Sequence, residues 1–413
     1  MRDQRVQIIL IIALFTILTG GFGFVSWPLG FKFTVRVFAV LLLLFLVFMA
    51  QFTERQHFRY FVLALAFLPF VSVLYSYGQY DQPLQDGIKG TLPSLLWLFY
   101  FVLHRFKVKE ESFLKAIFCI AVFVVLVQIV QQFTYPNAWF GIRDEENLTS
   151  EGEIAENRNG IWRFSVGING IFTAICLFYF WCKMLKRMRY DYLLVVALMI
   201  VSVYLTQTRQ VIISVVLTLF LSFFIGRGSK KVWLIMGGAV ILVILYMNLD
   251  MLFGEFIQMA QQDNNKQYIR FLAANYFWRE TFTSLQAAFF GHGDAVSGSF
   301  LALHDQLTED YRFFISDVGF IGMMWKYGIF YVLLCYGLML YVFLINKDKV
   351  PLYIRLFVLF AAIPSIMIFP MLSPISNIMW SFLLYFCDRH INRLNIARLL
   401  VLLLEKYKHL LPR

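Results

Sequence analysis

Two groups of polar residues in this sequence have side chains that could bind an anionic substrate. The first is the stretch Thr206-Gln207-Thr208-Arg209, inside an apolar region between about residues 192 and 226. An arginine costs roughly 2.5–3.5 kcal/mol at the centre of a bilayer on insertion scales, and less near its surface. Arg209 therefore either lies at a helix turn beside lipid headgroups, or binds phosphate oxygens together with the hydroxyls of Thr206 and Thr208.

The second group lies between residues 268 and 328 and contains, in order, Arg270, Arg279, Gly291-His292-Gly293, His304, Arg312 and Asp317. His304 could act as a general base, because the ordinary pKa of histidine is near neutrality, or it could be a solvated loop residue. The glycines beside His292 indicate a tight turn, so His292 is either a turn residue or a substrate contact. Asp317 is predicted to be the N-cap of the helix that follows it.

Membrane helices must position these groups. The chain has 413 residues, of which 60% are hydrophobic and 15% charged, and its mean hydropathy is +0.70. Repeated long apolar runs predict an all-α polytopic membrane protein with one integral membrane domain of residues 1–413. About twelve transmembrane helices are expected, centred near residues 15, 43, 67, 97, 122, 173, 199, 218, 241, 336, 360 and 381.

The distribution of Lys and Arg predicts the orientation of these helices. The net charge of +11 lies mostly in short clusters between apolar runs, which is typical of topology signals and argues against a nucleic-acid partner. Both termini are therefore predicted to be cytoplasmic, with residues 389–413 forming an amphipathic helix on the cytoplasmic surface. The five cysteines lie in apolar segments without metal-ligand spacing and are predicted to be buried and inert.

Two long loops are predicted on the extracytoplasmic side. The acidic loop of residues 134–163 is either a solvated surface or a surface that contacts sugar through its carboxylates and nearby aromatic residues. The large loop of residues 253–327 is expected to contain an amphipathic helix at the membrane interface within residues 268–293, with Arg279 on its solvated face. Arg209, Arg270 and His304 would then share the extracytoplasmic side.

The order of these motifs resembles that of the O-antigen polymerase and O-antigen ligase superfamily. The Thr206–Arg209 stretch is similar to that family's Thr-x-Ser-Arg turn, with Thr208 in the place of serine. Arg270 and the glycines around His292 resemble its loop arginine and Gly-x-Gly. His304 and Asp317-x-Gly319-x-x-Gly322 are similar to its histidine and glycine signature. The resemblance covers roughly residues 190–345 by motif and the whole chain by layout, and the longer gap after His304 favours a polymerase.

The resemblance implies a GT-C-like, metal-independent glycosyltransferase that needs no cofactor and polymerises undecaprenyl-diphosphate-linked oligosaccharides on the periplasmic face of the bacterial inner membrane. The product would be O-antigen, capsular polysaccharide or exopolysaccharide, and a chain-length co-polymerase is an implied partner. The implied site roles divide into three sets: diphosphate binding by Arg209, Arg270, Arg312, Thr206 and Thr208, catalysis by His304 and Asp317, and secondary contacts by His292 and Arg279.

Two alternatives stay open. An O-antigen ligase would use the same half-reaction but transfer the glycan to lipid A core. A polysaccharide flippase or transporter would share the layout of about twelve spans with both ends inside. Transporters, however, usually place paired polar features near the midplane of two related halves, whereas here the polar residues gather on one face.

Overall fold

A computed structural model describes residues 3–25, 30–48, 56–141, 155–158, 160–164, 166, 170–225, 269–345, 350–369, 371 and 373–407. This part of the chain is almost wholly helical, and its only strands are β1 (Ala155–Arg158) and β2 (Ile161–Phe164). The two strands pair antiparallel, with Ala155 opposite Phe164. The predicted all-α class is therefore confirmed, with one small hairpin added.

The described residues of the N-terminal part, up to residue 134, contain nine helical elements. They are α1 (Gln4–Leu18), α2 (Gly20–Gly23), α3 (Phe31–Phe48), α4 (Arg59–Phe67), α5 (Pro69–Tyr80), α6 (Leu84–Thr91), the 3-10 helix η1 (Leu92–Leu98), α7 (Phe99–Phe106) and α8 (Glu110–Thr134). Pro69 and Pro93 each lie in the first turn of a helical element, where a proline lacks only an amide that would be unpaired anyway.

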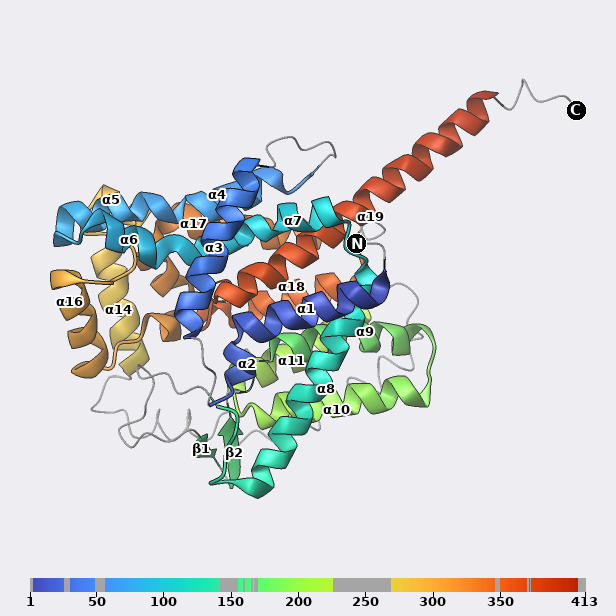
Figure 1. Ribbon diagram of the computed structural model, residues 1–413, viewed down its shortest axis with the longest axis horizontal. Helices are drawn as coiled ribbons and strands as arrows, with labels where there is room; N and C mark the ends of the chain where they lie inside the picture. The colour runs from blue at the N-terminus through green and yellow to red at the C-terminus, as the bar shows by residue number, and fades with distance from the viewer. Residues whose placement is uncertain are drawn as a thin grey trace, which may run out of the picture.

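The second part of the chain contains the other helices that lie in the described ranges. They are α9 (Ile171–Lys186), α10 (Tyr190–Leu205), α11 (Arg209–Ile225), α14 (Ile269–Thr281), α15 (Leu285–Phe290), α16 (Gly298–Glu309), η2 (Ile315–Val318), α17 (Gly319–Leu344), α18 (Leu352–Ala362), η3 (Ile363–Ile366) and α19 (Pro374–Tyr407). Figure 1 shows the N-terminus and the projecting end of α19 at one end of the helical body, and α5, α6, α14 and α16 at the opposite end.

Several of these helices are suited to a membrane. Three stretches among the described residues are long and apolar enough to cross one, namely Arg59–Tyr80, Glu110–Thr134 and Ile315–Leu344. Four shorter apolar helices cover Gln4–Leu18, Tyr190–Leu205, Arg209–Ile225 and Leu352–Ile366. Every predicted span centre that falls on described residues lies in a helix, residue 97 in η1 and the others in α-helices, while residue 241 lies outside them. The apolar helices thus indicate a membrane protein.

Helix α19 runs through the main hydrophobic core. Every residue from 375 to 388 is buried, so this part of the helix is surrounded on all sides rather than on one face. It packs against η1 and α7. Trp380 and Phe382 are almost fully buried, and the Phe382 ring stacks on Phe113 of α8 with centroids 4.6 Å apart. The same helix continues without a break to Tyr407, so residues 389–407 are helical and extend the core helix, while the predicted position of residues 389–413 on the cytoplasmic surface stays a prediction.

A buried carboxylate lies where this helix leaves the core. The side chain of Asp388 is fully buried and accepts a hydrogen bond from the backbone N–H of His57 at 3.0 Å. It also contacts the Tyr100 hydroxyl and lies 3.2 Å from Nε2 of His104. A buried carboxylate requires such partners because its desolvation is costly. Asp388 therefore joins α19 to α7 and to the segment before α4.

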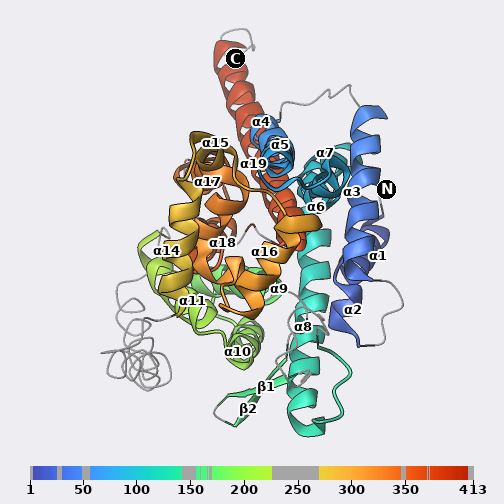
Figure 2. The ribbon, with the colours of Figure 1, turned by 90° about the vertical axis from the view of Figure 1, so that its left-hand side faces the viewer.

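A second, smaller core joins α14, α16, η2 and the first turns of α17, and α15 packs on α17; we call these elements together the helical cap. The buried members of this core are Ala273, Phe277, Phe300, Leu307, Val318 and Trp325. On α14, Ala273, Phe277 and Thr281 are buried at four-residue intervals, which is the spacing of one helix face. The cap lies at the end of the body that faces the viewer in Figure 2. The range 268–293, in which an amphipathic helix is expected, contains α14 and, after a break at residues 282–284, the separate short helix α15.

A left-handed turn follows α1. Gly20, Gly21, Phe22 and Gly23 have φ values of 58°, 62°, 61° and 82°. Glycine adopts this region freely, but a residue with a Cβ loses about 1–2 kcal/mol there. The cost at Phe22 is offset by burial of its ring and by a hydrogen bond from its N–H to the Thr19 hydroxyl at 2.9 Å.

Two adjacent glutamines at the end of α8 hold the loop that follows. Gln131 donates to the carbonyl of Phe140 at 2.9 Å and accepts from its N–H at 2.7 Å. Gln132 does the same with Trp162, at 2.6 and 2.9 Å. Trp162 lies in β2, and its ring stacks on Tyr135 at 3.9 Å. Phe140 and Trp162, which lie near the two ends of the predicted acidic loop, are therefore both hydrogen-bonded to α8.

The cysteines are only partly as predicted. All five are free, and four are buried: Cys176, Cys182, Cys335 and Cys387. Cys119 on α8 is exposed, so the prediction of burial is wrong for this residue. An apolar helix that faces the bilayer exposes its side chains to lipid, and hydropathy alone does not tell that face from the packed one.

Candidate functional site

The turn between α10 and α11 carries the first group of predicted site residues. Gln207 adopts a left-handed conformation with φ of 48°, which ends α10 and lets α11 begin at Arg209. The Thr206 hydroxyl donates to the carbonyl of Val203 at 2.7 Å, and the Thr208 hydroxyl donates to that of Thr206 at 3.1 Å. Both hydroxyl protons are thus held by the backbone, so a phosphate would have to displace a carbonyl to receive them.

A buried group of hydrogen-bonded polar side chains joins the helices next to this turn. The Ser202 hydroxyl donates to Oε1 of Gln128 at 2.6 Å, and the Thr173 hydroxyl lies 3.3 Å from the Ser202 hydroxyl. These side chains come from α10, α8 and α9, and all three are buried. Buried polar groups that satisfy one another fix the relative positions of their helices. Arg209, which is half-buried, therefore projects from a rigid three-helix platform.

Arg270 and Asp317 form an ion pair in the helical cap. Arg270 lies in the first turn of α14 and Asp317 in η2, with 3.4 Å between Nη2 and Oδ2. The two side chains are 39% and 40% exposed, and such solvated pairs contribute at most about 1 kcal/mol. A diphosphate could therefore replace the carboxylate at low cost. The expected N-cap role of Asp317 is wrong, because Val318 is the N-cap of α17 and no side chain caps it.

The helices that begin at Arg209 and just after Asp317 both contact η3. Helix α11, which starts at Arg209, packs against η3. Gly319, two residues after Asp317, approaches the backbone of Ile366 in η3 so closely that an added Cβ would overlap the Ile366 carbonyl. Helix α11 and the first residue of α17 thus contact the same short element, η3. Gly322 is packed as closely, since a Cβ on it would overlap the carbonyl of Ile315.

His304 lies on α16 at the border between the cap core and its exposed face. Its Nδ1 atom is 3.6 Å from Oδ1 of Asp305, which is beyond hydrogen-bond length, and its side chain is 35% exposed. Phe300 and Leu307, four residues before and three after it, are buried in the cap core. The imidazole is therefore anchored by its helix and partly accessible, which is compatible with a general base and also with a solvated residue.

His292 is enclosed. Its ring stacks on Trp325 with centroids 4.8 Å and planes 13° apart, and Nδ1 lies 3.1 Å from the Trp325 carbonyl. The side chain is almost fully buried, and this burial lowers the pKa of His292 to about 4. A neutral, enclosed imidazole supports the turn-residue alternative rather than a substrate contact.

The buried imidazole makes a pH-dependent contribution to stability. The pKa of His292 is about 4 in the folded protein and near 6.5 when unfolded, so the unfolded chain binds more protons between these values. Stability should fall as the pH decreases from 6.5 to 4, by at most roughly 3 kcal/mol from this group. We expect His292→Gln to flatten that part of the pH profile of thermal unfolding in detergent. An unchanged slope would show that other groups cause it.

The remaining predicted residues lie on the surface of the cap. Arg279 is on the exposed face of α14, as expected, and has no direct contact with Asp317 or His304 among the described interactions. Arg312 follows α16 in a left-handed conformation with φ of 55° and is exposed. The structure therefore joins Arg270 directly to Asp317 and places Arg279, His304 and Arg312 on the same cap without direct contact to that pair.

The sequence analysis missed one polar cluster. Lys326 of α17 forms an ion pair with Asp294, whose other oxygen accepts the Tyr327 hydroxyl at 2.7 Å. The side chain of Gln82 donates to the Asp294 carbonyl at 2.9 Å and accepts from the N–H of Val296 at 2.8 Å. The available signal was a lysine inside an apolar run, the same kind of anomaly that draws attention to Arg209. This cluster locks the loop after α15 against α5, α6 and α17.

Comparison with known proteins adds no assignment to this geometry. No protein-family description matches the chain, and a search of curated proteins finds no significant relative.

Proposed function

We propose that the protein is a membrane glycosyltransferase that polymerises polyprenyl-diphosphate-linked oligosaccharide repeats. In this proposal the chain crosses the bacterial cytoplasmic membrane about twelve times, and the helical cap and the Arg209 turn face the extracytoplasmic side. The observation that carries the proposal is the exposed Arg270–Asp317 ion pair in the helical cap, which also carries His304. The half-buried Arg209 begins α11, and this helix packs against the same element, η3, that Gly319 of the cap approaches.

The chemistry follows from the substrate. An acceptor hydroxyl attacks the anomeric carbon of the donor sugar, the bond from this carbon to the diphosphate oxygen breaks, and the polyprenyl diphosphate leaves. Negative charge grows on the leaving diphosphate, and guanidinium groups stabilise it best through paired N–H donors. Arg209 and Arg270 supply such donors, while His304 would take the proton of the hydroxyl. Asp317 would release Arg270 when the diphosphate arrives.

The proposed position of the site on the extracytoplasmic side also fits this substrate. Nucleotide-linked sugars are confined to the cytoplasm, so a reaction on the other face needs a donor that the membrane itself carries. A lipid diphosphate delivers the sugar and the leaving group together, and the enzyme needs mainly to position two glycans. Polar groups that gather at one end are less typical of a flippase, in which binding groups lie near the membrane midplane.

A reconstituted assay tests the proposal. Purified protein in liposomes should convert a synthetic lipid-linked repeat into a ladder of products that differ by one repeat. A single transfer that occurs only when lipid A core is added would indicate a ligase instead. Movement of the unmodified repeat between leaflets without any new glycosidic bond would contradict the enzyme and favour the flippase.

A further inference from the structure

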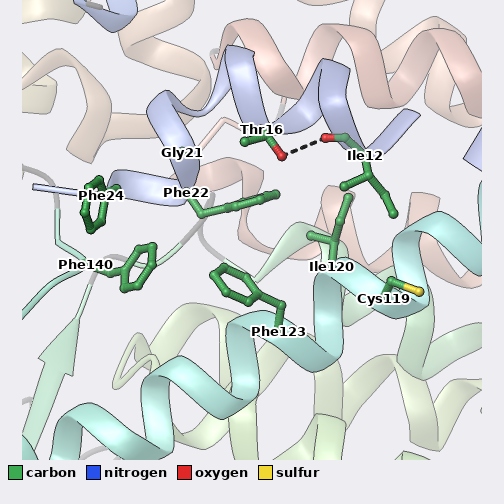
Figure 3. A pocket seen from close by; sticks show the side chains of 9 residues that line it. All are labelled: Ile12, Thr16, Gly21, Phe22, Phe24, Cys119, Ile120, Phe123 and Phe140. Atoms are coloured by element: carbon green, nitrogen blue, oxygen red, sulfur yellow. Dashed lines mark hydrogen bonds between the residues drawn. The ribbon is translucent and has the colours of Figure 1, made fainter. Parts of the chain in front are cut away.

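A cavity opens in the side of the helical body, away from the candidate site. It has a volume of about 420 Å³ and lies between α1, the left-handed turn α2 and α8. Figure 3 shows its lining, which consists of Ile12, Thr16, Gly21, Phe22, Phe24, Cys119, Ile120, Phe123 and Phe140. We call it the aromatic pocket. Its size is within the usual range of about 300–1,000 Å³ for small-ligand sites.

The wall of the aromatic pocket is apolar and continuous. Four phenylalanine rings follow one another, with centroid distances of 5.5 Å for Phe22–Phe123, 5.5 Å for Phe123–Phe140 and 5.4 Å for Phe24–Phe140. The one hydroxyl in the lining, that of Thr16, donates to the carbonyl of Ile12 at 2.8 Å. The pocket thus offers an occupant hydrophobic contact and aromatic faces, but no hydroxyl proton for a polar group.

The backbone around the pocket is specially shaped. Gly21 and Phe22 belong to the left-handed turn after α1, and Phe22 holds φ of 61° although it has a side chain. Such strain persists only where the surroundings impose it, and it often marks a binding site. A backbone bridge between Phe24 and Phe140 then closes one end of the wall. The concavity is therefore built by the fold and is more than a gap between two straight helices.

The surface around the opening identifies the occupant. Helix α8 is one of the three stretches suited to cross a membrane, and near the pocket it exposes Phe123 and Leu126 at 38% and 53%. Helix α1 exposes Ile9 and Ile17 in the same way. If α8 crosses the bilayer, as its length and composition allow, the rim is continuous with surface that faces lipid, and the pocket opens to hydrocarbon. Figure 2 shows α1 and α8 on the opposite side of the body from α11 and α14.

We propose that the aromatic pocket binds one acyl chain of a membrane phospholipid. The lateral position relative to α11 and α14 favours a resident lipid over the substrate, whose diphosphate would lie near Arg209 and Arg270. The proposal depends on α8 contacting the bilayer and not on the activity proposed above. A held chain would occupy space between α1 and α8 and support the strained turn that carries Phe22.

Lipid retention tests this proposal independently of catalysis. Protein washed extensively in detergent and returned to a defined phosphatidylglycerol should retain one molecule in native mass spectrometry. Cys119→Trp places a large side chain at the opening, and we expect it to lower retention at least tenfold. Leu126→Trp is the matched control, because Leu126 lies on the same helix, is exposed and does not line the pocket. Equal retention by both variants would overturn the proposal, as would retention of polyprenyl lipids alone.

A second measurement uses the wild-type chain. Cys119 is the one exposed cysteine among the five, so a thiol reagent should label this position selectively. If an acyl chain fills the pocket, phosphatidylglycerol should slow labelling at least fivefold relative to protein in detergent alone. Labelling at the same rate with and without the lipid would contradict occupancy.

Discussion

Replacing Gly328 by alanine is expected to abolish the folded protein or nearly so. Gly328 interrupts α17 with φ of 82° and ψ of 169°, and an added Cβ would overlap the carbonyl of Phe289 in α15. A left-handed or otherwise strained residue costs about 1–3 kcal/mol, and overpacking against rigid backbone adds about as much again. Against a typical total stability of about 5–15 kcal/mol, this loss is severe.

The kink at Gly328 has such an effect because two turns interlock there. The N–H groups of His292 and Gly293 donate to the carbonyls of Trp325 and Lys326, each at 2.8 Å. A Cβ on Gly291 would lie 2.5 Å from the Lys326 carbonyl. The backbones of the two turns are therefore in close contact, and neither can move away to make room for a side chain at Gly328. The glycines beside His292 therefore serve the packing of the cap on α17.

Gly337 in the same helix is the matched control. An added Cβ at Gly337 meets no atom within 4 Å, and alanine favours a helix over glycine by about 1 kcal/mol. Size-exclusion profiles and thermal unfolding in detergent should show an intact or slightly more stable Gly337→Ala and an aggregated or absent Gly328→Ala. If both variants behave alike, the interlocked geometry described here is wrong.

Replacing Arg270 by alanine is expected to lower polymer synthesis about 100- to 1,000-fold with little change in stability. The loss of one preorganised donor to a developing anion has this size in other enzymes. The ion pair that Arg270 forms with Asp317 is solvent-exposed, so breaking it should change the unfolding free energy by about 1 kcal/mol at most. Arg270→Lys should recover part of the activity, because it keeps the charge but loses the paired N–H donors.

Arg279→Ala provides the comparison for this prediction. Arg279 lies on the same helix and is exposed, and the described residues place it in no contact with Asp317. The measurement is the length distribution and amount of product from a lipid-linked repeat, at matched levels of folded protein. Comparable losses in Arg270→Ala and Arg279→Ala would mean that general surface charge matters, and undiminished synthesis by Arg270→Ala would remove it from the site.

Much of the helical organisation could be read from the sequence because apolar runs are a local signal. A run of about 20 apolar residues is a helix in a bilayer whatever lies next to it. The same reasoning placed α1, α8 and α17 near their observed positions. It could not separate α14 from α15, since the break between them at residues 282–284 depends on how Ser284 caps α15 by accepting the N–H of Ala287.

The site was harder to predict because its contacts are not local. Arg270 and Asp317 were each singled out, but their pairing joins residues 47 positions apart and depends on the folding of the whole cap. Lys326 and Asp294 were overlooked, because a carboxylate after a glycine turn is common in solvated loops. Only the structure shows that Asp294 is largely enclosed beside Tyr327.

The two glutamines that end α8 have a practical consequence. Gln131 binds both the N–H and the C=O of Phe140, and Gln132 binds both the N–H and the C=O of Trp162. The two ends of the segment between Phe140 and Trp162 are therefore held on α8 whatever the length of that segment. An epitope tag or protease site spliced between those two anchors should leave the helices undisturbed. Antibody access to such a tag in intact versus opened cells would then report directly on which side of the membrane the segment between Phe140 and Trp162 lies.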